Sequence, residues 1–178
     1  MSLGIIQAVY ADCGFDLHIV ARREFMQIAI DEALAAVEFG EHPIGAVVVQ
    51  GGDRIVGQSG NRVHRDNDPT AHAEIVAIRQ AARALGRRSL PDCTLHSTLE
   101  PCGMCAGACI HAGISVAFGT FMTEAEQYAQ DNPGVKFRSL GISMPDAIEA
   151  SGTQNIFTLG GLLMPDACRR LFAHMPRK

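Results

Sequence analysis

Two short stretches organise this chain, His72-Ala73-Glu74 and Pro101-Cys102-Gly103-Met104-Cys105. The first has the pattern H-x-E and the second the pattern P-C-x-x-C. An imidazole and two thiolates form the mixed nitrogen and sulfur set that zinc prefers, and here they supply three ligands. Structural zinc sites usually have four protein ligands, whereas a catalytic site keeps one position open for water. We therefore expect His72, Cys102 and Cys105 to bind Zn²⁺, with Glu74 as the catalytic residue that moves protons beside it.

Other interpretations of these motifs are less specific. A C-x-x-C pair alone also fits a redox motif or half of a structural zinc site. The chain has no second C-x-x-C or H-x-H pair that would supply a fourth ligand, which favours the catalytic interpretation. A zinc-binding regulatory module without activity is the non-enzyme alternative. The presence of Glu74 argues against it, because the set of metal ligands, water position and carboxylate is complete.

Length and composition predict one domain, 1–178, that buries a sizeable core. The chain has 178 residues, of which 47% are hydrophobic, and residues 1–20 form an N-terminal extension that we expect to pack on the domain. Its net charge of −4 argues mildly against a protein dedicated to nucleic acid, because such binding depends on neutralising phosphates. Four of the six cysteines lie outside the C-x-x-C motif and are scattered, which fits a reducing cytoplasm. No apolar run is long enough to span a membrane.

The pattern of apolar and turn residues predicts strands that alternate with helices after an initial hairpin, which indicates an α/β sandwich with a mixed sheet. The second helix should begin near Pro69 with Asp68 or Thr70 as its N-cap, and the third should carry both cysteines in its first turn. Beyond Thr120 the pattern of apolar and turn residues predicts secondary structure less clearly. The predicted strands are 44–50, 54–58, 93–98, 114–118 and 155–159; the predicted helices are 22–40, 68–85, 102–112, 123–130 and 165–174, with an irregular segment at 131–143 and a helical turn at 146–150.

The combined H-x-E and P-C-x-x-C pattern is the signature of zinc deaminases that act on nucleobases. The chain accordingly resembles the cytidine-deaminase-like superfamily. The resemblance implies a three-layer α-β-α sandwich with a five-stranded mixed sheet, and zinc held where two helix N-termini meet. It further implies a cytoplasmic hydrolase that replaces an exocyclic amine by a carbonyl with release of ammonia, and a homodimer.

The resemblance also suggests where the substrate binds. Asn61 has the spacing of an asparagine that hydrogen-bonds the base in related deaminases, which favours a binding role over that of a turn residue after Gly60. Ile44, in the Pro-Ile-Gly triplet, would form an apolar wall for a flat ring or belong to the strand core. Ala73 is a further candidate beside the metal. Glu100 would act through its backbone carbonyl, which contacts the leaving amine in related families.

The choice of substrate separates two hypotheses. Residues 68–75 and 99–108 closely resemble the bacterial tRNA adenosine deaminases, and the similarity extends over about residues 22–119. Residues 120–153 form a divergent insert whose start, Met122 to Tyr128, is acidic where the tRNA enzymes are basic. We therefore favour a free nucleobase or small nucleoside-like heterocycle of the cytosine, guanine or isocytosine type. A tRNA-specific adenosine-to-inosine deaminase is the alternative, so nucleic acid is a possible but less favoured partner.

Overall fold

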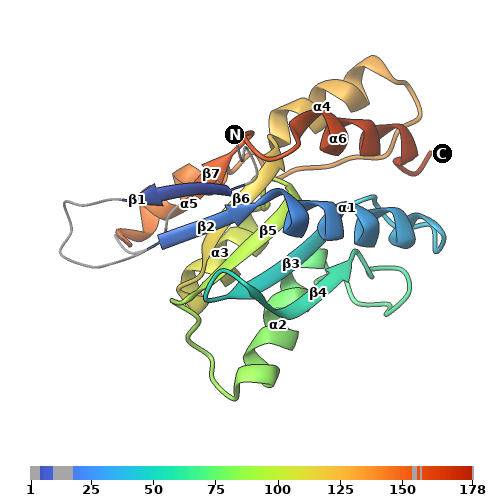
Figure 1. Ribbon diagram of the computed structural model, residues 1–178. Helices are drawn as coiled ribbons and strands as arrows, with labels where there is room; N and C mark the ends of the chain where they lie inside the picture. The colour runs from blue at the N-terminus through green and yellow to red at the C-terminus, as the bar shows by residue number, and fades with distance from the viewer. Residues whose placement is uncertain (1–4, 10–17, 154–155, 157, 178) are drawn as a thin grey trace.

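The computed structural model describes residues 5–9, 18–153, 156 and 158–177. Its centre is a five-stranded sheet in the order β4-β3-β5-β6-β7 (Figure 1). β3 pairs antiparallel with both β4 and β5, whereas β5, β6 and β7 are parallel. The predicted mixed five-stranded sheet is therefore confirmed. The strand bounds are β3 Gly45–Gln50, β4 Arg54–Gly60, β5 Cys93–Leu99, β6 Ser115–Thr120 and β7 Thr158–Gly160.

The central strands are apolar on both faces because helices cover both faces of the sheet. Alternate residues of β3 show this arrangement. Ala46 and Val48 belong to a core cluster with α2, α3 and α5, whereas Val47 and Val49 belong to a second cluster with α1 and α6. Successive side chains of a strand point to opposite faces, so each cluster fills one side of the sheet.

The helices thus form the two outer layers of the predicted α-β-α sandwich (Figure 1). The first layer comprises α2 Ala73–Leu85, α3 Gly103–Ala112 and α5 Met144–Ser151. The second comprises α1 Arg23–Val37 and α6 Pro165–Arg170, which continues into the 3₁₀ helix Leu171–His174. α4 Met122–Asp131 packs beside that C-terminal end through a third cluster that includes Met122, Ala125 and Phe172. None of the helices in the described part of the chain has the length and apolar character needed to cross a lipid bilayer.

Glycine allows one helix on each side to approach the sheet closely. A Cβ atom placed on Gly45 would lie 1.9 Å from the backbone oxygen of Ala29 in α1. On the opposite face, a Cβ on Gly57 would lie 2.3 Å from the backbone oxygen of Ala77 in α2. Any side chain at either position would push a helix away from the sheet, so the Pro-Ile-Gly triplet is also a packing feature.

The N-terminal part adds an element that the sequence did not predict. β1 Ile5–Val9 and β2 His18–Arg22 form a separate antiparallel two-stranded sheet. β2 lies against β5, β6 and α1 (Figure 1), so this part of the extension packs on the domain as expected. Residues 1–4 and 10–17 lie outside the described part.

The start of α2 differs from the prediction. His72 is the N-cap and Ala73 the first helical residue, so neither Asp68 nor Thr70 caps the helix and Pro69 does not lie in its first turn. Instead, the Asp68 carboxylate accepts bonds from the backbone and hydroxyl of Thr70 at 2.8 and 2.7 Å. Asp68 therefore stabilises a local turn before the helix, a pattern that competes with helix capping.

The chain after β6 is more regular than the sequence indicated. The predicted helical turn at 146–150 is a complete helix, α5, which begins two residues earlier. Ser143 caps it by accepting a bond from the Asp146 backbone N–H at 3.2 Å. The segment 132–143 is irregular, as expected. β7 spans Thr158–Gly160, and residues 155 and 157 of the predicted strand lie outside the described part.

Candidate metal and catalytic site

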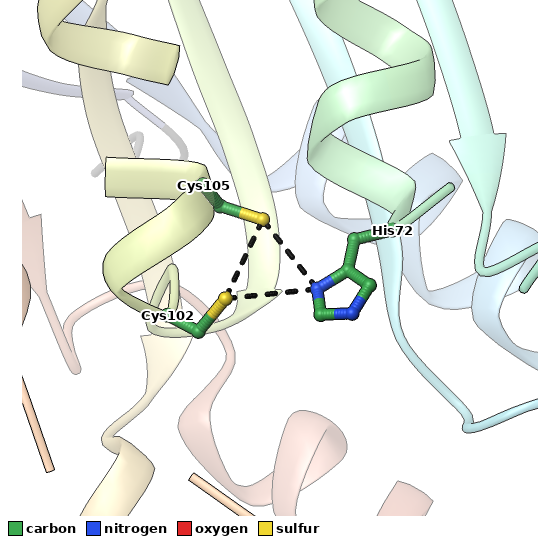
Figure 2. Close-up of side chains that lie close together, drawn as sticks. All are labelled: His72, Cys102 and Cys105. Atoms are coloured by element: carbon green, nitrogen blue, oxygen red, sulfur yellow. Dashed lines mark hydrogen bonds between the residues drawn. The ribbon is translucent and has the colours of Figure 1, made fainter. Parts of the chain in front are cut away.

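Two helix N-termini bring His72, Cys102 and Cys105 together. His72 is the N-cap of α2 and Cys102 the N-cap of α3, with Cys105 in the first turn of α3. Figure 2 shows the three side chains pointing toward one another. The two sulfur atoms are 3.7 Å apart, and His72 Nδ1 lies 3.6 Å from each. The prediction that Cys102 lies inside the helix is therefore off by one position.

This triangle has the size that a zinc ion requires. With Zn–S bonds of about 2.3 Å and a Zn–N bond of about 2.1 Å, tetrahedral geometry separates two sulfur ligands by about 3.8 Å and sulfur from nitrogen by about 3.6 Å. The observed edges agree with these values. In the described part of the chain, no other group of three His, Cys, Asp or Glu side chains gathers in this way. The donor set and its spacing thus fit zinc with one position left open.

The surroundings favour the thiolate form of Cys102. Contact with the Cys105 thiol, aided by His72, lowers the pKa of Cys102 to about 4 despite its burial. In turn, the hydrogen bond between Cys102 and His72 raises the pKa of His72 above its ordinary value. Both helix N-termini add positive potential, which also favours a thiolate. A bound cation would take the place of the protons that these groups share, because metal ligands bind in their deprotonated form.

Glu74 lies in the first turn of α2, and its side chain is buried beside this triangle. The residue is 3% exposed, and one carboxylate oxygen, Oε2, has no hydrogen-bond partner. The other oxygen, Oε1, accepts a long hydrogen bond from the Ser97 hydroxyl at 3.5 Å. Burial, followed by the charge on Cys102, raises the pKa of Glu74 above its ordinary value. An unpartnered buried carboxylate is costly, so its presence here points to a ligand or solvent partner at the site.

Asn61 lies next to the site but has a partner that the sequence analysis missed. Its side-chain amide donates to Glu41 Oε2 at 2.9 Å, and both residues are buried. Its backbone N–H donates to the Ile44 carbonyl at 2.9 Å, and the following residue bonds to Ala71, directly before His72. Ile44 is half-buried and packs against two core clusters, which fits the packing role; its role as a wall for the substrate ring stays a prediction.

Glu100 has a structural role that its sequence position did not reveal. Its carboxylate accepts from the backbone N–H of Met122 at 3.0 Å and from that of Met144 at 2.9 Å. These are the first residues of α4 and α5, so one buried carboxylate caps two helices. The expected contact through the Glu100 backbone carbonyl stays a prediction. Ala73 is fully buried in the core cluster, and its role in substrate binding stays a prediction.

Two further features near the metal ligands were not found from the sequence. His42 lies close enough to His72 for their charges to interact, and burial followed by His72 lowers its pKa below the ordinary value. The Phe137 ring lies 6.2 Å from the His42 ring, and a Cβ on Gly103 would lie 3.5 Å from the Ile142 side chain. The irregular segment 132–143 therefore contacts residues on both sides of the site. Only the tertiary structure could show this, because the segment is distant in sequence.

The fold and the site together are those of the cytidine-deaminase-like superfamily, with a mixed sheet and a His-Cys-Cys cluster between two helix N-termini. Residues 20–120 match the family of the cytidine and deoxycytidylate deaminase zinc-binding region. The chain belongs to this family, which supports zinc as its cofactor.

Three comparisons describe its relatives. The tRNA-specific adenosine deaminase of Agrobacterium fabrum is 53% identical over 93 residues, which span 52% of this chain and 60% of that protein. A structure from studies of A-to-I editing by tRNA:A34 deaminases at the wobble position of transfer RNA has a TM-score of 0.69 and 35% identity, covering 84% of this chain and 99% of that one. The guanine deaminase of Bacillus subtilis has a TM-score of 0.57 and 31% identity, covering 74% and 93% of the two chains.

Proposed function

We propose that this protein is a zinc-dependent hydrolytic deaminase that converts the exocyclic amine of a nucleobase to a carbonyl. The observation that carries the proposal is the buried Glu74 carboxylate, with one oxygen unpartnered, beside a cluster that matches zinc geometry. His72, Cys102 and Cys105 would hold the ion. When bound, zinc lowers the pKa of a water molecule toward neutrality and so supplies the nucleophile.

The chain's own residues would provide the proton transfers and the binding of the base. Glu74 takes a proton from the attacking water and delivers protons to the ring nitrogen and to the departing ammonia. Its burial and raised pKa suit a group that must both accept and return protons near neutral pH. Asn61 offers hydrogen bonds to the base, and Ile44 offers an apolar surface to the ring.

As substrate we propose an adenosine in a tRNA anticodon loop. Relatives named tRNA-specific adenosine deaminase from Agrobacterium fabrum, Aquifex aeolicus and Haemophilus influenzae are 53%, 43% and 43% identical to this chain. These comparisons favour tRNA over the free heterocycle that we preferred from the sequence. The matched stretches span 60%, 60% and 56% of those relatives.

A free nucleobase of the guanine type is the second candidate, and the segment 132–143 favours it. Phe137 contacts His42, and Ile142 lies against Gly103, the first residue of α3. The segment is also fixed at its start, because the Lys136 backbone N–H donates to the Pro176 carbonyl at 2.9 Å. We expect a segment tethered beside the metal ligands to favour a small substrate over an RNA. The 31% identity to a guanine deaminase agrees with this candidate.

The experiment is a panel of substrates tested with one preparation of the protein. Ammonia release is measured for cytosine, guanine, isocytosine and their nucleosides, and inosine formation is measured for an adenosine in an anticodon stem-loop. We expect about one zinc per chain by elemental analysis and turnover of the stem-loop. The Glu74→Gln variant is the matched control. It should keep its zinc and lose about 10²–10⁴-fold or more in turnover, because general acid–base catalysis contributes that much.

Turnover of guanine without turnover of the stem-loop would show that the substrate is a free nucleobase of the guanine type. Wild-type turnover by Glu74→Gln would show that another group moves the protons. Absence of zinc, or absence of turnover with every member of the panel, would contradict the proposed activity. Zinc binding without any turnover would support a regulatory zinc-binding module instead.

A further inference from the structure

We propose that Glu41 is a positioning residue that fixes the direction in which Asn61 presents its side-chain amide to the base. This inference rests on the proposed function, because it deepens the role of Asn61 in binding the substrate. Glu41 follows α1 and is distant in sequence from the metal ligands and from Asn61. It is nevertheless only 1% exposed, which is unusual for a glutamate and calls for a reason.

Both oxygens of Glu41 have donors. Oε2 accepts from the Asn61 amide nitrogen at 2.9 Å, and Oε1 accepts from the Arg65 backbone N–H at 2.8 Å. The backbones are anchored as well, because Glu41 N–H donates to Ala36 and Asn61 N–H donates to Ile44. The carboxylate thus joins the end of α1, the end of β4 and the loop before the metal ligand His72.

This arrangement decides which end of the Asn61 amide faces Glu41. A carboxylate only accepts hydrogen bonds, and an amide has a donor end and an acceptor end. The nitrogen of Asn61 must therefore face Glu41, because the reverse orientation would place two oxygen atoms against each other. The side-chain carbonyl oxygen of Asn61, Oδ1, does not bond to Glu41 and is the end available to the base. An oriented acceptor selects a base edge with a donor, such as an amino or ring N–H group.

Replacing Glu41 by glutamine should reverse that orientation. The Arg65 backbone N–H is a fixed donor, so the oxygen of the new glutamine must face it. The NH₂ group of the glutamine then faces Asn61, which must turn its own oxygen toward that group. Asn61 would consequently present nitrogen where the wild-type protein presents oxygen. The substitution changes hardly any volume, so it tests hydrogen-bond direction rather than packing.

The test is a cycle of four proteins: wild type, Glu41→Gln, Asn61→Asp and the double variant. We expect Glu41→Gln to raise KM by about 10- to 100-fold with little change in kcat, because a mismatched polar group opposes base binding. Asn61→Asp should also be impaired, because it sets two carboxylates together. The double variant should recover most of the loss, because the glutamine NH₂ can donate to one oxygen of the introduced aspartate while the other oxygen restores the acceptor.

Three measurements distinguish this inference from a structural role. Zinc content and the urea midpoint should be similar in wild type and Glu41→Gln, and the affinity for a non-hydrolysable base analogue should follow the KM values. A double variant that is worse than both single variants, or a Glu41→Gln protein with unchanged KM, would overturn the inference while wild-type turnover still supports the proposed function. Lack of turnover in the wild-type protein would instead reject that function, and analogue affinities would still test Glu41.

Discussion

At the scale of single residues, His96 should make the stability of the fold depend on pH. His96 is fully buried on β5, and its ring packs edge-on against the ring of Phe25, with the centroids 5.4 Å apart. Its Nδ1 has no hydrogen-bond partner among the described residues. Burial lowers its pKa from 6.5 to about 4. Between these values the unfolded chain binds a proton that the folded chain does not, so stability falls as the pH decreases from about 6.5 to about 4. The loss should reach about 3 kcal/mol. Urea unfolding at pH 7 and pH 5 should show a smaller difference for His96→Met than for wild type. Equal differences would contradict this assignment.

At the scale of elements, Glu100 should couple the metal site to the helices of the divergent insert. Its carboxylate caps both α4 and α5, and Cys102 follows two residues later. In Glu100→Gln, one backbone N–H must face the amide NH₂ and loses its acceptor. We expect destabilisation on the order of 2 kcal/mol and faster hydrogen exchange at Met122 or Met144. Glu38→Gln, at an exposed glutamate after α1, is the control and should have almost no effect. Unchanged exchange in Glu100→Gln would show that the helices do not depend on this cap.

At the scale of the whole molecule, the surface of α3 favours association of two copies. The helix is apolar on nearly all sides, and Met104, Gly107, Ala108 and Ile110 are only partly buried in the described structure. A Cβ on Gly107 would meet nothing within 4 Å, so this position faces open space. We expect the wild-type protein to sediment as a dimer at micromolar concentration, and Gly107→Glu to shift it toward the monomer, because a buried unpaired charge is costly at an interface. Gly107→Ala is the matched control and should remain dimeric. A monomeric wild-type protein would reject the homodimer.

The sequence by itself determined the metal ligands as candidates and the class of fold. The zinc cluster could be predicted because it depends on residue types, H-x-E and P-C-x-x-C, at fixed local spacings. The strands between residues 44 and 120 were equally readable, since an apolar run bounded by turn residues is a local signal. Local capping residues and a proline likewise predicted that a helix begins near Pro69. That prediction was wrong because Asp68 bonds to Thr70 and delays the helix until Ala73.

Only the tertiary structure decided how the site is enclosed and oriented. Glu41 reaches Asn61, Glu100 reaches the first residues of α4 and α5, and Ile142 lies against Gly103. Each of these contacts joins residues that are far apart in sequence and carry no pattern of their own. The residue type alone does not show whether a carboxylate is buried or exposed. What separates the two cases is desolvation and the direction of nearby donors, and both arise only when distant elements pack together.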